Sequence, residues 1–455
     1  MDVLTFSRIQ FGDTAAFHIL WPLMSIGLAL YLAIMEGMWL YTKDESYYRQ
    51  LRFWIKIFVL TFAIGVASGF PLSFQFGTNW AAFSNAAGSF FGNILGFETT
   101  IAFTLETASL GILLFGWKRV PRAVHFIANL FVLIGASLSG FWIVAANSWM
   151  QVPHGVAFVE GKFVVTDYLA AIFNPDTLVS FAHMWLACIV ATMFLVAGIS
   201  AAVLLTKNAA DATRAFFLHS LRYALMLIII TTPVQMVVGD MFGGILEANQ
   251  PAKLAAYELH WNTNPPGTGA SLNLFAWPRA DGGGNVFQIS VPNLLSYIVV
   301  HTPDGEVKGL NDFPPLDRPS VVDAIITFLS FRVMVGLGVV MFFIAVWGIV
   351  LWRRGVLTLP AILSRRWFLR VLVAAIPAGF IATEAGWMVR EIGRQPWVVY
   401  GMMRTTDALS SNLALPQVGT SLIGLSVIYA ALAVAFVVFV VRIVRRGPDL
   451  TTPIP

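Results

Sequence analysis

Long apolar runs alternate with polar connections along the chain. Each run has the roughly 20 residues that an α-helix needs to cross the hydrocarbon core of a membrane. The pattern therefore predicts an all-α fold, a polytopic bundle of about nine transmembrane helices in a lipid bilayer. The predicted spans are residues 14–38, 54–76, 93–116, 124–146, 180–205, 216–239, 322–352, 368–389 and 417–442.

One polar connection is much longer than the others. Residues 240–321 are rich in Gly, Pro and Asn, and connections of this length are usually functional or disordered. Residues 251–261 have the pattern of a short helix, whereas the remainder predicts irregular structure. The chain is thus expected to divide into helices one to six (1–239), this loop (240–321) and helices seven to nine (322–455).

Basic residues are distributed unevenly between the connections. They gather after odd-numbered spans, near Lys43 and Lys118 for example, and are scarce after even-numbered ones. Because cytoplasmic loops carry the excess of Lys and Arg, the N-terminus is predicted outside and the C-terminus in the cytoplasm. The outer turn after the eighth span breaks the rule with Arg390, Arg394 and Arg404, and we expect these cations to bind an anionic group.

Composition supports a membrane protein and excludes other classes. The chain is 58% hydrophobic and 11% charged, with a pI near 9.2 that basic loops explain without a nucleic-acid partner. The single cysteine excludes a disulfide framework, and the lack of a Cys-x-x-Cys-His motif excludes covalently attached c-type haem. The first apolar run is long and carries His18 and Glu36, so no cleavable signal peptide is expected.

Five side chains in the outer half of the predicted helices are candidates for chemistry. A carboxylate in lipid is costly, so Glu384 in the eighth span should have a partner and a function. The other four are His18, Glu98, His183 and Met334. Taken singly, a histidine near a helix end is more often hydrogen-bonded than a ligand, and a methionine usually packs in the core. His125 and His219, at the inner boundary, are expected to be interfacial.

Taken together, the five side chains favour haem. Haem iron accepts His or Met as axial ligands, and His183 with Met334 would give a six-coordinate iron that transfers electrons. The other three could serve high-spin irons with an open position, as oxygen chemistry requires. The cations expected to offset haem propionates or buried carboxylates are Arg332, Arg390 and Arg394.

Two sequence segments are long and unusual. They are Phe-Gln-Phe-Gly-Thr-Asn-Trp at residues 74–80 and Gly-Arg-Gln-Pro-Trp at residues 393–397. With the shorter segments Phe-Arg-Val-Met at 331–334 and Glu-Ala-Gly-Trp at 384–387, they make the chain resemble subunit I of the cytochrome bd quinol oxidases over nearly its whole length.

The resemblance implies a set of residue roles. His183 and Met334 would ligate a low-spin haem b, while His18, Glu98 and Glu384 would surround a high-spin haem b and a haem d, or a third haem b in its place. Other residues that would contribute to haem binding or catalysis are Arg332, Trp387 and Arg394. Lys253 and Glu258 match the positions that bind quinol and accept its protons. Glu106, about 12 Å from Glu98 along a helix, would lie on a proton path from the cytoplasm.

The resemblance also implies an activity and partners. The chain would oxidise ubiquinol or menaquinol at the outer face and reduce O2 to water, generating a proton motive force without pumping. It would reside in the bacterial cytoplasmic (inner) membrane with a second large membrane subunit and, in many cases, a small single-helix one. Its short outer loop resembles that of the cyanide-insensitive branch.

Two other functions compete with this interpretation. A haem-copper oxidase would need several membrane histidines around copper, and the chain has too few. A solute or ion transporter could use Glu384 with Arg390 and Arg394 as its substrate site, with the His and Met residues serving only as packing.

Overall fold

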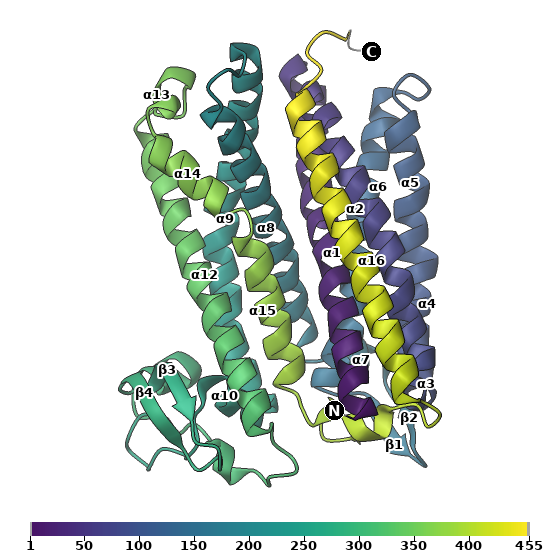
Figure 1. Cartoon of the computed structure of the whole chain (residues 1–455), viewed down its shortest axis with the longest axis vertical. Helices are drawn as coiled ribbons and strands as arrows, with labels where there is room; N and C mark the ends of the chain where they lie inside the picture. The colour runs from purple at the N-terminus through teal and green to yellow at the C-terminus, as the bar shows by residue number, and fades with distance from the viewer. Residues whose placement is uncertain (1, 453–455) are drawn as a thin grey trace.

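The computed structural model describes residues 2–452. Within these residues nine helical segments are long and apolar enough to cross a membrane, which confirms the predicted all-α bundle. Figure 1 shows the helices side by side, with the two termini at opposite ends of the bundle. The regular helices of the spans are α1 (Val3–Thr42), α2 (Glu45–Thr78), α3 (Ala81–Ala87), α4 (Asn93–Phe97), α5 (Thr104–Phe115), α6 (Arg122–Gln151), α7 (Tyr168–Ile172), α8 (Thr177–Leu205), α9 (Asp211–Asn249), α12 (Val321–Arg353), α14 (Arg366–Ala374), α15 (Ala378–Ile392) and α16 (Leu415–Arg446).

The two ends of the bundle differ in structure. One end, at the bottom of Figure 1, carries the N-terminus and the small extramembrane elements, and we call it the hairpin end. These elements are β1 (Val156–Val159), β2 (Lys162–Val165), α10 (Pro251–Glu258), β3 (Leu272–Pro278), β4 (Asn285–Val291) and α11 (Leu294–Val300). The other end carries α13 (Leu359–Leu363), the turns rich in Lys and Arg, and the C-terminus, and we call it the basic end.

The long connection is more ordered than its composition predicts. The short helix is confirmed as α10, but α9 continues to Asn249 before it. The prediction of irregular structure for the remainder is wrong, because β3 and β4 form an antiparallel hairpin. Ala276 of β3 packs with Ala255 and Phe328, so the hairpin covers α10 and the start of α12. Apolar side chains on one face therefore outweigh the Gly and Pro content of the segment.

The third span is not one regular helix. Two π-helical turns, η1 (Gly88–Gly92) and η2 (Glu98–Phe103), interrupt it. A π turn inserts a residue and so redirects the side chains around it, and such turns are frequent at functional sites. Glu98 is the first residue of the second turn. The eighth span is also broken, between α14 and α15, at residues 375–377.

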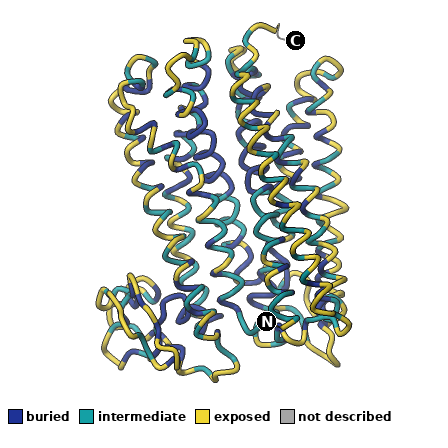
Figure 2. The backbone as a smooth tube through the Cα atoms, in the orientation of Figure 1, coloured by how far each residue is buried: buried dark blue, intermediate teal, exposed yellow. Residues whose placement is uncertain are grey.

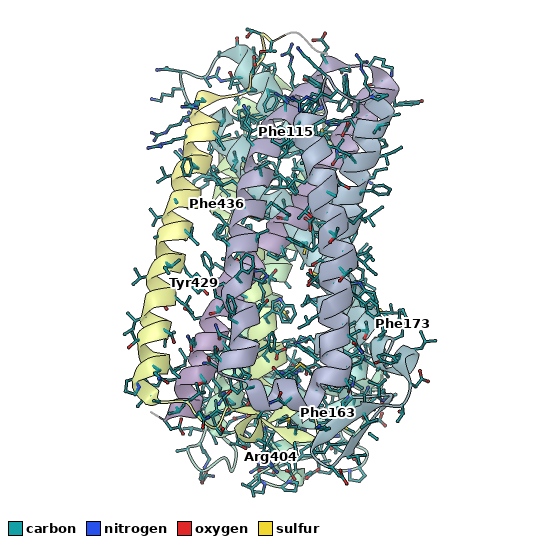
Figure 3. All side chains as sticks on the ribbon, turned by 90° about the vertical axis from the view of Figure 1, so that its right-hand side faces the viewer. Phe115, Phe163, Phe173, Arg404, Tyr429 and Phe436 are labelled. Carbon is teal, nitrogen blue, oxygen red and sulfur yellow. The ribbon has the colours of Figure 1, made fainter. Side chains whose placement is uncertain are left out.

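The most buried span lies at the centre of the bundle. In its most apolar stretch, 83% of the residues of α7–α8 are buried, against 11% for α16. Figure 2 shows the buried backbone concentrated inside the bundle. At the periphery α16 packs on α1, where the rings of Phe17 and Tyr429 stack at 4.5 Å and those of Trp21 and Phe436 meet at 5.0 Å (Figure 3).

Candidate functional site

A packed cluster marks one level across four helices. It contains Leu23 of α1, Ala136 of α6, Cys188 of α8 and Phe380 of α15. From this level toward the hairpin end, His18 and His183 are five residues away and Glu384 is four, which is about 6–8 Å at 1.5 Å per residue. Three candidates from three different helices therefore lie at one depth.

The remaining two candidates lie close to the same depth. Glu98 accepts a hydrogen bond at 2.7 Å from Ser139, which is three residues from Ala136 on α6. Met334 packs against Gly386, two residues beyond Glu384, so close that a Cβ on Gly386 would lie 3.0 Å from the Met334 sulfur. We call His18, Glu98, His183, Met334 and Glu384 the ligand layer.

The contacts of His18 select one tautomer. Its Nδ1 lies 3.0 Å from Oγ of Ser68, which itself donates to the carbonyl of Gly65 at 3.0 Å. Since the serine proton is used there, Ser68 accepts from Nδ1–H, and Nε2 keeps its lone pair. A partner that fixes the tautomer in this way is typical of a metal-ligating histidine. Gly69 leaves room beside the ring, because a Cβ there would lie 3.3 Å from Cε1.

His183 and Glu384 retain polar atoms without protein partners. Nε2 of His183 lies 3.3 Å from the amide nitrogen of Gln235, while its buried Nδ1 has no partner within residues 2–452. Oε1 of Glu384 is also buried without a partner. Gly239 approaches the His183 ring, where a Cβ would lie 3.1 Å from Cε1. Because buried polar groups are rarely left unpaired, these atoms are suited to bind a group from outside the chain.

Glu106 lies outside the ligand layer, toward the basic end. It is buried on α5 against Gly135 of α6, where a Cβ on the glycine would lie 2.8 Å from Cβ of Glu106. Trp387 is half-buried on α15, one turn beyond Glu384.

The cations near the hairpin end have carboxylate partners within the protein. Arg332 donates to Glu258 at 2.5 Å, Arg390 to Asp176 at 2.6 Å, and Arg394 to Glu391 at 2.5 Å. We call these three pairs the ion-pair belt. Of the two anions expected from sequence, propionate or buried carboxylate, the structure provides the carboxylate. The half-buried Arg404 is likewise paired, with Asp317 at 2.5 Å.

Arg390 is engaged by the protein along its whole guanidinium group. Besides Asp176 it donates to Ser180 at 2.9 Å, to Ser148 at 3.1 Å and to Asn147. It is therefore not available for a transported anion, which removes half of the substrate site that the transporter hypothesis required. Arg394 keeps two buried N–H groups, on Nε and Nη1, without partners.

Lys253 and Glu258 both lie on α10 but face different neighbours. Nζ of Lys253 donates to Gln151 at 2.8 Å, whereas Glu258 pairs with Arg332. Burial and the nearby charge of Arg390 hold the pKa of Lys253 well below its usual range. Burial raises the pKa of Glu258 to about 7, although Arg332 opposes the shift. Glu258 can therefore exchange a proton near neutral pH.

His125 lies near the start of α6, at the basic end, and its side chain is covered by neighbouring helices. The side chain is 4% exposed, and its Nδ1 lies 2.6 Å from Oε1 of Glu36, which is fully buried. Hydropathy could not find this contact because the two residues lie on different helices, 89 positions apart. His219 is half-buried between the rings of Tyr47 and Tyr223.

The chain is similar to known proteins over nearly its whole length. A family model described as cytochrome bd terminal oxidase subunit I matches residues 6–448. The chain is 35% identical to cytochrome bd ubiquinol oxidase subunit 1 of Bacillus subtilis (strain 168), with 99% of this chain and 95% of that protein covered. It is 32% identical to cytochrome bd-II ubiquinol oxidase subunit 1 of Escherichia coli (strain K12), with 98% and 97% covered. The solved bd oxidase from Geobacillus thermodenitrificans matches with a TM-score of 0.87 at 31% identity, covering 98% of this chain and 99% of that one.

Proposed function

Because the chain belongs to the cytochrome bd terminal oxidase subunit I family, we propose that it holds the haems and the quinol site of a respiratory quinol oxidase that reduces O2 to water. The observation that carries the proposal is the ligand layer. Five potential ligands or acid groups from five spans lie at one depth, and His183 and Glu384 each retain a buried polar atom without a protein partner.

The residues of the layer fit haem. His183 with Met334 would hold a low-spin haem b, and His18, Glu98 and Glu384 would surround a high-spin haem b and a haem d or third haem b. The lone pair on Nε2 of His18 and the space beside Gly69 and Gly239 support this assignment. When bound, haem iron supplies electron transfer at a six-coordinate site and O2 chemistry at an open one.

At the hairpin end, the protein's own groups would handle quinol. Glu258 accepts a quinol proton as its carboxylate, and Arg332 stabilises the charge that forms when the proton leaves again. Lys253 and the free N–H groups of Arg394 supply hydrogen-bond donors for quinol oxygens. Proton release at this end, which we assign to the outer face, adds to the proton motive force.

At the basic end, protons would enter from the cytoplasm. Glu106 receives them and passes them toward Glu98 and its partner Ser139. Because protons are consumed from one side and released on the other, charge is separated without a pump. The basic turns of this end agree with a cytoplasmic location and the N-terminus outside.

The relatives are named as first subunits of ubiquinol oxidases, and we propose a second large membrane subunit, and a small single-helix one, as partners in the bacterial inner membrane. The function is tested with the purified complex and ubiquinol or menaquinol in an oxygen electrode. We expect quinol-dependent O2 consumption. Quinol that leaves the O2 concentration unchanged, in a preparation that contains haem, would reject the oxidase.

A further inference from the structure

A second buried polar cluster lies nearer the basic end and has no role in the steps above. Glu36 of α1 is fully buried between two groups of α6. Its Oε1 lies 2.6 Å from Nδ1 of His125, and its Oε2 accepts from the amide of Asn129 at 2.7 Å. Nε2 of His125 donates to the carbonyl of Leu113 on α5 at 3.1 Å. We call Glu36, His125 and Asn129 the inner cluster.

The hydrogen bonds of the inner cluster leave one proton free to move. A carbonyl only accepts, so Nε2 of His125 carries a proton and the ring is oriented by Leu113. The proton between Nδ1 and Glu36 then has two positions, on an imidazolium facing a carboxylate or on a carboxylic acid facing a neutral ring. Because this shift can offset the charge on the carboxylate, Glu36 can take up a proton and release it again.

Two further atoms indicate that the cluster continues through water. In the part of the chain that the structure describes, Oδ1 of Asn129 and Nε1 of Trp117 are both buried without a protein partner. The Trp117 ring lies 4.2 Å from that of His125. One atom is an acceptor and the other a donor. Buried groups of this kind are usually satisfied by ordered water, which can also conduct protons.

The inner cluster is aligned with Glu106. On α5 the buried positions Glu106, Ser109 and Leu113 follow one face. On α6 His125, Asn129 and Gly135 are all buried, with Gly135 about 120° around the helix from Asn129. The two helices meet at Leu113 with His125 and at Glu106 with Gly135. Asn129 is six residues from Gly135, about 9 Å along the helix. Ser109 lies between Glu106 and Leu113 on α5, so its level falls within that interval, and water would bridge the rest.

We infer that the inner cluster is the proton relay that loads Glu106 from the basic end. His125 is three residues from the start of α6, next to the basic turn, and so faces the source of protons. A proton arrives through water at the carboxylate of Glu36 as another leaves Glu36 toward Ser109 and Glu106, so Glu36 ends as it began. His125 keeps its Nε2 proton and holds the carboxylate through Nδ1. The inference rests on the proposed oxidase function.

A purely structural ion pair would behave differently from a relay. If Glu36 only fastens α1 to α6, the amide of Glu36→Gln preserves size and one hydrogen bond and should be tolerated better than the shorter Glu36→Asp. A relay needs a group that can lose a proton, so Asp should function and Gln should not. The order of the two variants therefore separates the explanations.

The experiment measures turnover with quinol and proton uptake from the basic-end side of vesicles that contain the complex, at wild-type haem content. We expect Glu36→Gln to lower both by about tenfold or more, Glu36→Asp to recover at least a third of the wild-type rate, and Glu45→Gln, an exposed acid of the same end, to match wild type. His125→Gln is the second variant and should behave as Glu36→Gln does.

Three results would overturn the relay. They are wild-type proton uptake in Glu36→Gln or His125→Gln, a Gln variant faster than the Asp variant, and loss of haem from both Gln variants, which would assign the cluster to assembly. If any of these results is found while the wild-type complex oxidises quinol, the relay is rejected but the oxidase function is retained. A wild-type complex that binds haem and oxidises no quinol would reject both.

Discussion

In the ion-pair belt every carboxylate faces a guanidinium, whereas in the ligand layer His183 and Glu384 each keep a buried atom without a protein partner. Both regions bury polar side chains within the same helices. The belt pairs each of its charges internally, because an unpaired buried charge is costly, although Arg394 keeps two N–H groups without a partner within residues 2–452. The layer leaves Nδ1 of His183 and Oε1 of Glu384 unpaired, although both atoms are buried.

The difference separates two uses of buried polarity. Paired groups tie α15 to α8 and α12 to α10, since Arg390 of α15 reaches Asp176 at the start of α8 and Arg332 of α12 reaches Glu258 of α10. The unpaired atoms of His183 and Glu384 can instead bind a cofactor, which the chain itself does not supply. A change in the layer should therefore remove a cofactor, and a change in the belt should remove stability.

The largest effect is expected in the layer. His183→Leu removes the proposed axial ligand without adding a charge, so one haem should be lost. Quinol oxidation should fall by about 100-fold or more, which exceeds the loss of activity expected when only a residue that supports a ligand is changed. Haem content per protein and turnover measure the change. His154→Leu, at an exposed position of the hairpin end, should retain both; full haem content in His183→Leu would exclude the ligand role.

The next effect is expected in the belt. Asp176→Asn leaves Arg390 buried without its counter-charge, so the protein should lose about 3 kcal/mol of stability. Thermal unfolding followed by circular dichroism measures the loss. The exposed pair of Asp211 with Arg214 is a matched control, and Asp211→Asn should cost less than about 0.5 kcal/mol. Equal stability of the two variants would contradict the distinction between the pairs of the belt and exposed pairs.

A smaller change is expected from Met334→Leu. The side chain keeps its volume but loses the sulfur, so the low-spin haem should change its spectrum while the protein remains folded. The visible spectrum of the reduced protein is the measurement. Met341→Leu, a buried methionine two turns further along α12, should leave the spectrum unchanged. A Met334→Leu spectrum identical to wild type would remove Met334 from the layer.

The smallest effect concerns pH. The pKa of Glu258 is raised to about 7 by burial, so below that pH the carboxyl already holds its proton and cannot accept another. The kcat/KM for quinol should therefore rise with pH through about 7 and then level off. Glu258→Gln should lose this rise and slow the reaction about tenfold. Glu306→Gln, exposed in the same connection, should keep the wild-type profile; a retained rise in Glu258→Gln would assign it to another group.

The sequence predicted the spans and the candidate ligands but not their partners. Hydropathy finds membrane helices because each must be apolar over its own length, and this holds for all nine within residues 2–452. Asp176 and Arg390 are 214 positions apart, so no local spacing connects them. The alternating strands β3 and β4 offered a signal, but the Gly and Pro residues around them obscured it. The π turn at Glu98 leaves no mark on hydropathy.

The central claim is that the ligand layer exists to hold haem. Its most direct test is the visible absorption spectrum of the purified, dithionite-reduced complex, with haem counted against protein. The account predicts an intense Soret band and more than one haem per copy of this chain, with a red-shifted chlorin band if haem d is present. A folded complex without a Soret band would contradict it.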